Sequence, residues 1–183
     1  IKTYELFWEF WGKTFLLNSF EDLKEKINEI STDKIVLKPR FWEQCQWIYV
    51  IEKNEIKEDL YEDWTDILLQ EFLDSTVWIE GIVEWLHEVN IFYVNWEFSW
   101  ARMKKPPEWS LISSATWSSI WKVWWLKEKD VPKDLLDIIK KLDNKMLDYP
   151  LRLYRADFVN TKDWYKMIEL NSRPWVMHKD KEW

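Results

Sequence analysis

The sequence predicts an α+β fold built from short strands and a few amphipathic helices. Apolar and polar residues alternate with a period of two from 153 to 171, which is typical of paired strands. A helical spacing of apolar residues follows Val131, and a strand followed by a helix opens the chain. With 183 residues, 47% of them hydrophobic, the chain can bury a sizeable core as one domain or two lobes.

The first half of the chain predicts four strands and one helix. The helix begins after Ser19, a good N-cap, with Asp22 placed as a capping-box acid and apolar residues on one face from Phe20 to Ile30. Apolar runs predict strands at 13–17, 34–40, 48–51 and 66–73, the last containing the polar pair Gln70-Glu71.

The loop 41–47 between two of these strands is a weak signal for phosphate binding. Its backbone N–H groups could approach phosphates if Trp42 and Trp47 stand for glycines, with Lys38 beside them. Lysines at strand ends are usually solvated, so both interpretations of Lys38 stay open at this point.

The second half predicts two strands on either side of Asn95-Trp96, then a helix over 131–147. Arg102, Lys104 and Lys105 form a basic cluster at the end of the second strand. These side chains are either solvated or positioned to meet a phosphate or a substrate carboxylate. His87 is left without a chemical role, because a lone histidine is more often structural.

The stretch 153–174 predicts a β-hairpin that carries a candidate metal site. If Thr161 and Tyr165 close a three-residue loop, Asp157 lies directly opposite Glu169, and Asn171 points to the same side. Two opposed carboxylates are unfavourable unless a cation lies between them, and such oxygens are ligands that Mg²⁺ prefers. The alternative is a solvated hairpin face with scattered charge.

Tryptophan is abundant where glycine is expected. The chain has 17 Trp and only 2 Gly, whereas ordinary usage of about 7% would give roughly 13 glycines. Several tryptophans occupy turn positions that favour positive φ, and these are Trp42, Trp47, Trp96, Trp164 and Trp175. We therefore expect most of them to be glycines encoded by UGA. The alternative is an aromatic surface that stacks sugars or bases, as in a carbohydrate-binding protein.

Charge and cysteine content exclude several classes of protein. The formal net charge of −7 disfavours a nucleic-acid partner, and no apolar run is long enough to cross a membrane. The single Cys45 excludes an internal disulfide and a cysteine-rich metal site, which suggests a reducing, cytoplasmic location.

Taken together, these segments resemble the ATP-grasp fold of ATP-dependent carboxylate–amine ligases, enzymes similar to glutathione synthetase and D-alanine ligase. The resemblance lies in the order and approximate spacing of VLKPRF(W)EQCQ(W)IYVI, LLQEFLD, HEVNIFYVN(W)EF, RADF and ELNSRP(W). It implies a two-lobe α+β fold with the nucleotide between the lobes. Residues 1–73 would form the small lobe and 74–183 the large lobe, with a further domain expected before Ile1.

The resemblance also implies roles for individual residues. ATP would contact Lys38 through a phosphate and the backbone of Glu71 and Leu73 through adenine, with Glu80 near the ribose. Arg102 would stabilise the γ-phosphate or an acyl phosphate, and Arg173 would either do the same or hold the substrate. Mg²⁺ would be held by three residues of the hairpin, Asp157, Glu169 and Asn171.

The implied reaction is activation of a carboxylate by ATP, followed by attack of an amine on the acyl phosphate. The substrates would be small-molecule or peptide carboxylates and amines. Two features depart from the family pattern: Cys45 replaces a small residue, and Asn90 replaces an arginine found in some relatives. A nucleotide-binding module without ligase activity is the alternative.

Overall fold

The computed structural model describes residues 7–40, 47–77, 79–80, 87–94, 97–106, 111, 122–148 and 153–171. Five residues to which a role was assigned from the sequence lie outside these ranges, and they are Trp42, Cys45, Trp96, Arg173 and Trp175. Within the described residues, none of the helices is long and apolar enough to cross a membrane.

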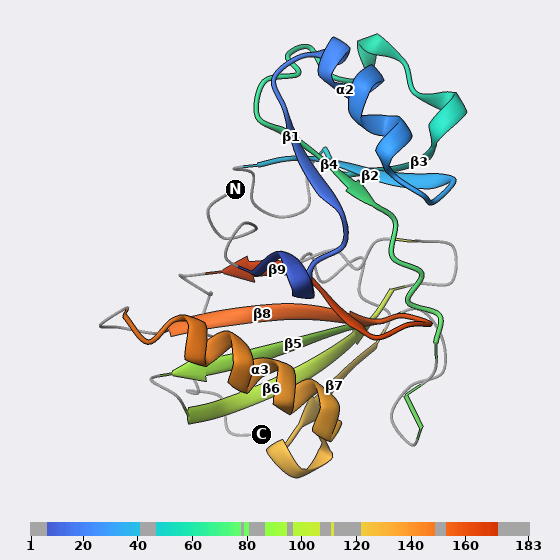
Figure 1. The fold of residues 1–183 in the computed structure, drawn as a ribbon. Helices are drawn as coiled ribbons and strands as arrows, with labels where there is room; N and C mark the ends of the chain where they lie inside the picture. Colours follow the sequence, from blue (N-terminus) through green and yellow to red (C-terminus); the bar gives the residue numbers. More distant parts are fainter. Residues whose placement is uncertain are drawn as a thin grey trace.

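The chain forms two antiparallel sheets, one above the other in Figure 1. The smaller sheet has the order β1-β4-β2-β3 and the larger one β7-β6-β5-β8-β9. The strands are β1 Thr14–Leu17, β2 Lys34–Pro39, β3 Tyr49–Glu52, β4 Ile67–Glu71, β5 Glu88–Val94, β6 Glu97–Lys105, β7 Lys122–Leu126, β8 Leu153–Asn160 and β9 Tyr165–Asn171. The helices are α2 Phe20–Lys26 and α3 Lys133–Lys145, with short 3-10 helices at Trp8–Phe10, Ile27–Glu29, Lys53–Glu55, Glu58–Leu60 and Glu128–Asp130. This arrangement confirms the predicted two-lobe α+β fold.

In the small lobe, α2 begins at the predicted cap. The Ser19 side chain accepts a hydrogen bond from the backbone N–H of Asp22, whose own carboxylate accepts from the N–H of Asn18. The first of these bonds satisfies a backbone donor that the first helical turn leaves free, and the second ties the residue before the cap to the helix. One face of the helix joins the core beside the sheet, and this core contains Leu17, Leu23, Ile30, Ile35, Leu37, Ile67 and Leu69.

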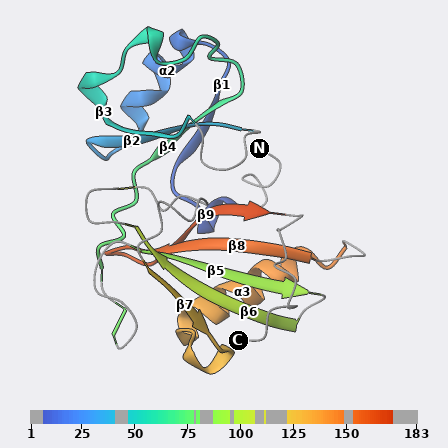
Figure 2. The same ribbon diagram turned by 180° about the vertical axis from the view of Figure 1, so that it is seen from behind.

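In the large lobe, one face of the sheet is apolar and the other is polar. α3 covers the apolar face, in front of the sheet in Figure 1 and behind it in Figure 2. Its buried residues Leu135, Ile138, Ile139 and Leu142 pack in one core with Val89, Ile91, Ala101, Met103, Ala156 and Phe158. Because neighbours along a strand point to opposite faces, the alternate residues of these strands point away from α3, toward the small lobe.

Two stretches of chain cross between the lobes beside each other. Phe7 and Phe10 belong to the core of the large lobe, and the chain then passes through Gly12 into β1. A Cβ atom at Gly12 would lie 3.1 Å from side-chain carbons of both Glu71 and Leu73 in the return crossing. A residue larger than glycine at position 12 would therefore require one of these side chains to shift by a few tenths of an ångström.

The β8–β9 hairpin corrects one detail of the prediction. Asp157 does lie opposite Glu169, but Asn160 pairs with Tyr165, so the loop has four residues rather than three. Trp164 therefore does not have the positive φ that we expected, and the backbone N–H of Thr161 donates to its carbonyl oxygen at 3.1 Å. A bulge at Ile168 shifts the register by one residue and restores the predicted pairing.

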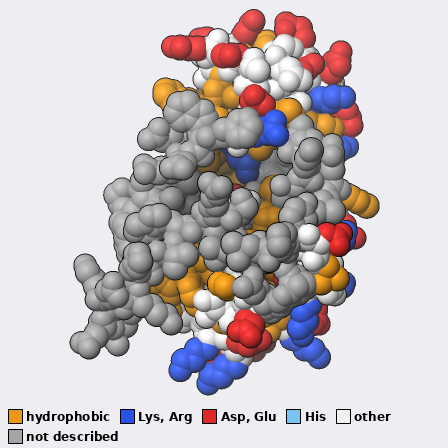
Figure 3. All heavy atoms as spheres, turned by 90° about the vertical axis from the view of Figure 1, so that its left-hand side faces the viewer, with side chains coloured by type: hydrophobic (Ala, Val, Ile, Leu, Met, Phe, Trp, Pro, Cys, Tyr) orange, Lys and Arg blue, Asp and Glu red, His pale blue; other side chains and the backbone are white. Residues whose placement is uncertain are grey.

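The exposed surface is rich in acidic side chains over the small lobe, as the face shown in Figure 3 illustrates. Lys and Arg side chains are more evident on that face at the opposite end of the large lobe. The distribution agrees with the negative net charge of the chain.

Candidate functional site

A cleft lies between the two sheets and is lined by residues of both lobes. The predicted site residues that line it are Lys38, Glu71, Leu73, Arg102, Asp157 and Glu169. They come from β2 and the end of β4 on one side and from β6, β8 and β9 on the other. The fold therefore brings together six residues that are up to 131 positions apart in the chain.

Lys38 reaches across this cleft. Its Nζ donates to Oε1 of Gln70 at 3.2 Å within the small lobe and to the backbone carbonyl of Ile168 at 3.1 Å in the large lobe. Ile168 is the extra residue of the β9 bulge, and a bulge leaves backbone groups outside the regular ladder. The bulge thus makes a carbonyl oxygen accessible to the lysine of the opposite lobe.

The crossing segment Glu71–Leu73 forms the back of the cleft. The backbone N–H of Glu71 donates to the carbonyl of Lys13 at 2.9 Å, and the N–H of Phe72 donates to the carbonyl of Lys34 at 3.4 Å. Beyond β4 the backbone leaves the sheet while still lining the cleft. Backbone groups at this point can form hydrogen bonds with the edge of a flat ligand.

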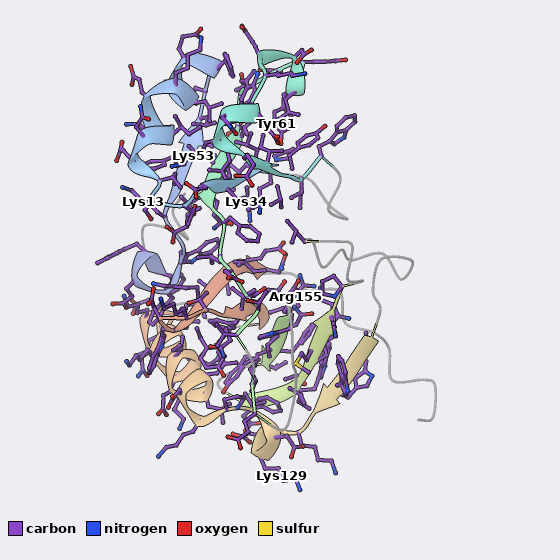
Figure 4. All side chains as sticks on the ribbon, turned by 90° about the vertical axis from the view of Figure 1, so that its right-hand side faces the viewer. Lys13, Lys34, Lys53, Tyr61, Lys129 and Arg155 are labelled. Carbon is purple, nitrogen blue, oxygen red and sulfur yellow. The ribbon has the colours of Figure 1, made fainter. Side chains whose placement is uncertain are left out.

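Asp157 and Glu169 lie opposite each other with a guanidinium between them. Arg155 donates from Nε to Oδ1 of Asp157 at 2.7 Å and from Nη2 to Oδ2 at 2.6 Å, and the same Nη2 lies 3.5 Å from Oε2 of Glu169. Figure 4 labels Arg155 on the side of the large-lobe sheet that faces the small lobe. The predicted repulsion between the two acids is therefore relieved here by an internal cation.

The environment of Asp157 is strongly acidic. Its side chain is buried, and this burial raises the pKa of the carboxyl; the neighbouring Glu88 carboxylate raises it further, while Arg155 opposes the rise. Glu169 adds to the same electrostatic field but is about half exposed. Lys104 also opposes the rise, so Arg155 and Lys104 both counterbalance the acidic groups around Asp157.

A buried polar network continues across the sheet from Asp157. Asn90 is a direct cross-strand partner of both Asp157 and Arg102, and its Oδ1 accepts from Nε of Arg102 at 2.7 Å. Glu88 accepts from Asn90 and forms a buried ion pair with Lys104, whose Nζ lies 2.7 Å from Oε1. Four strands thus present a continuous charged surface to the cleft.

Arg102 differs from an ordinary surface arginine. Burial lowers the pKa of its guanidinium, and the nearby charge of Arg155 lowers it further. The guanidinium also lies against the ring of Phe92, 5.9 Å from the ring centroid. Two arginines placed close together in this way favour a bound anion.

Three predicted site residues remain, and they are Glu80, Asn171 and Arg173. Glu80 is exposed and is not among the described residues that line the cleft. Asn171 pairs with Arg155 across the hairpin, and its Nδ2 is buried without a hydrogen-bond partner among the described residues. Arg173 lies outside the described residues.

Sequence reasoning did not assign four residues that help to build the site. Gln70, Glu88 and Arg155 received no role, and Lys104 was only one member of a basic cluster. Arg155 could have been found, because it lies two residues before Asp157 on the same strand and so on the same face. Glu88 could not, because its position beside Asp157 depends on the pairing of β5 with β8.

Comparison with known proteins identifies the fold. No protein-family model matches the chain, and no curated protein matches it. Among solved structures, the ATP-grasp ligase PsnB, complexed with a phosphomimetic variant of its minimal precursor, Mg and ADP, superposes with a TM-score of 0.63 and 13% identity over 97% of this chain and 50% of PsnB. D-cycloserine synthetase DcsG gives a TM-score of 0.64 and 13% identity, with 88% of this chain and 57% of that one covered.

A third similar structure is the macrocyclase MdnC, bound with the precursor peptide MdnA from Microcystis aeruginosa MRC. It has a TM-score of 0.59 and 20% identity over 92% of this chain and 50% of MdnC. The chain thus spans about half the length of the solved structures that it matches. At these identities the likeness establishes the fold, and this protein has the ATP-grasp fold.

Proposed function

We propose that this chain carries the ATP-binding lobes of a ligase that joins a carboxylate to an amine through an acyl phosphate. The observation that carries the proposal is the pair Asp157 and Glu169, opposed across one hairpin and facing a cleft between two ATP-grasp lobes. Arg155 offsets the repulsion within this pair, and the two carboxylates supply oxygen ligands of the kind that Mg²⁺ prefers.

The cleft offers suitable contacts for each part of ATP. The segment Glu71–Leu73 supplies backbone groups at the hinge, where adenine would lie, and Lys38 supplies an ammonium for a phosphate. The present cavity volume of about 160 Å³ is below the roughly 300–1,000 Å³ of typical small-molecule sites. ATP binding would therefore separate the lobes and replace the contact of Lys38 with Ile168. Glu80 keeps a weaker assignment to the ribose.

The hairpin residues fit a magnesium ion. The position of Arg155 Nη2, within contact distance of both Asp157 and Glu169, marks a place for a cation between the two carboxylates. Asn171, with its buried amide next to Arg155, is the third expected ligand. Mg²⁺ bound there would neutralise charge on the ATP phosphates during phosphoryl transfer.

The protein ligands alone do not make a complete metal site. Within the described part of the chain, no group of three or more His, Cys, Asp or Glu side chains could hold a metal ion. Mg²⁺ is commonly bound by one or two carboxylates together with substrate phosphates. We therefore expect Mg²⁺ to enter with ATP rather than before it.

Arginines would stabilise the charge that moves during the reaction. Arg102 is held toward the cleft by Asn90, and its guanidinium lies near that of Arg155. We assign Arg102, together with Arg173, to the transferred phosphoryl group or the acyl phosphate. Lobe closure would then exclude water, which would otherwise hydrolyse the acyl phosphate.

The substrates belong to the class of carboxylates and amines, as small molecules or within a peptide. PsnB and MdnC have each been solved in complex with a precursor peptide, which supports a peptide as a substrate class. No described feature favours nucleic acid or a membrane as a partner.

Calorimetric titration of Mg-ATP into the 183-residue chain tests the proposal directly. We expect saturable binding that requires Mg²⁺ and that is clearly weaker, but still measurable, in Lys38→Met. The protein expressed from its complete gene should form ADP only when both a carboxylate and an amine substrate are supplied. Binding of Mg-ATP without such turnover would favour a nucleotide-binding module, and no binding at all would contradict the proposal.

A further inference from the structure

The buried side chain of Gln70 connects Lys38 to strand β1. Gln70 lies in β4 and is only 3% exposed, yet it lines the cleft. Its Oε1 accepts from Nζ of Lys38 at 3.2 Å, and its Nε2 donates to Oγ1 of Thr14 at 2.9 Å. A buried amide with both ends bonded has a defined orientation, unlike a solvated one.

The partner beyond Thr14 determines which way the Gln70 amide points. The Thr14 hydroxyl donates its single hydrogen to the carbonyl of Gly12 at 2.9 Å, so its oxygen acts as an acceptor toward Gln70. The NH₂ group of Gln70 must therefore face Thr14, which leaves the carbonyl oxygen to face Lys38. The reverse orientation would place two donors, an NH₂ group and an ammonium, against each other.

Strand register holds the three side chains together. Thr14 and Gln70 are direct partners between β1 and β4, and on its other side Gln70 pairs with Val36, two residues before Lys38 on β2. Diagonal neighbours at this spacing are within reach of a long side chain. The chain of hydrogen bonds from Gly12 to Lys38 is thus built into the small-lobe sheet.

The other contact of Lys38 cannot serve the same purpose. Ile168 belongs to the opposite lobe, and its carbonyl is available only while the lobes are in contact. Gln70 lies in the same sheet as Lys38 and would move with it. A lysine side chain has many rotamers, so an acceptor that holds its ammonium in one place reduces the entropy lost when an anion binds.

We propose that Gln70 is a positioning residue that holds the Lys38 ammonium where the phosphates of a bound nucleotide would lie, with Thr14 setting the orientation of its amide. The role rests on the proposed function, since it requires a nucleotide in the cleft. Gln70 acts through Lys38 and contributes to nucleotide affinity only while Lys38 is present.

A double-mutant cycle tests this dependence. Dissociation constants for Mg-ATP are measured by calorimetry for the parent chain, Gln70→Leu, Lys38→Met and the double variant. We expect Gln70→Leu to weaken binding about tenfold, equivalent to about 1.4 kcal/mol. In the Lys38→Met background the same change should alter the dissociation constant by less than about twofold, because coupled residues are not additive. Additive effects would overturn the inference, since they would mean that Gln70 acts independently of Lys38.

Two further variants serve as a control and as a substitute for Gln70→Leu. Glu52→Leu removes the partner of Lys34, which lies 3.3 Å from Glu52 in the same sheet, and it should bind Mg-ATP like the parent. If Gln70→Leu does not fold, Thr14→Val provides the same cycle, and an unchanged affinity in Thr14→Val would overturn the inference. Failure of the parent chain to bind Mg-ATP would instead refute the proposed function, and with it the role of Gln70.

Discussion

Asp157 and Glu169 are direct cross-strand partners, and the guanidinium of Arg155 contacts both carboxylates. Arg155, a residue of the same hairpin, offsets part of the negative charge of the two carboxylates. An added cation would therefore have to share Asp157 with Arg155 or displace it. Substitutions of Glu169 and of Arg155 therefore test whether a metal ion binds between the two carboxylates.

Replacing Glu169 by Gln should weaken Mg-ATP binding by about tenfold, or about 1.4 kcal/mol, because the amide removes one of two opposed charges. Stability without metal should change by less than about 1 kcal/mol, since Glu169 is half exposed and its ion pair is long. Calorimetry and urea denaturation measure the two quantities. Asp163→Asn, an exposed acid in the loop of the same hairpin, is the control. An equal loss of Mg-ATP affinity in Glu169→Gln and Asp163→Asn would show that Glu169 does not bind the metal ion.

Replacing Arg155 by Met should destabilise the metal-free protein by about 3–5 kcal/mol, because it leaves the buried Asp157 without its ion-pair partner. Mg²⁺ without ATP should recover part of this loss in Arg155→Met, where the guanidinium is absent, and should stabilise the parent chain little. Urea denaturation with and without Mg²⁺ measures both effects.

The control for this experiment is Arg40→Met, which removes an ion pair with Asp66 that is partly exposed. Its cost should stay below about 1 kcal/mol. An equal stabilisation of the parent and Arg155→Met by Mg²⁺ would show that the ion does not take the place of the guanidinium.

Replacing Trp47 by glycine should make the protein more stable. Its φ is +60°, which is unfavourable for a bulky residue, and its side chain is 56% exposed, so little packing would be lost. We expect Trp47→Gly to stabilise the fold by about 1 kcal/mol in chemical denaturation. Trp164→Gly is the matched control: Trp164 is similarly exposed but has no positive φ, so it should gain nothing.

The codons provide an independent test of the same idea. We expect UGA at Trp47 and at Trp42, Trp96, Trp164 and Trp175, and ordinary glycine codons at Gly12 and Gly81. Trp64 should be encoded by UGG, because it is buried, its Nε1 donates to the carbonyl of Glu58 at 2.9 Å and its ring packs edge-on against Tyr61. UGG codons at these five positions would contradict the prediction that the tryptophans stand for glycines.

Gly12→Ala should disturb the hinge. The added Cβ would lie about 3.1 Å from carbons of Glu71 and Leu73, so one of these side chains must shift, at a cost of about 1–3 kcal/mol. Affinity for Mg-ATP should fall with stability, because the same residues line the cleft. Lys13→Ala, a change at the exposed neighbour, should leave affinity unchanged; an equal loss there would contradict the role of Gly12.

The sequence alone determined the two-lobe α+β fold and much of the cleft. The spacing of apolar and polar residues is a local property, so it predicted α3, the face shared by Asp157 and Glu169, and every strand except β7, whose residues were expected to form a loop. The loop of that hairpin was predicted one residue too short, yet the pairing of the two acids was right because a bulge at Ile168 compensates. Such a bulge has no clear local signal.

The tertiary structure decided what occupies the space between those acids and what surrounds them. Arg155 relieves the repulsion that had suggested a metal ion, and Glu88 approaches Asp157 only because β5 pairs with β8. The bonds from Lys38 to Gln70 and to Ile168 likewise join positions 32 and 130 residues apart. Contacts of this kind depend on register and lobe packing, which arise from burial across the whole chain and cannot be read from a short segment.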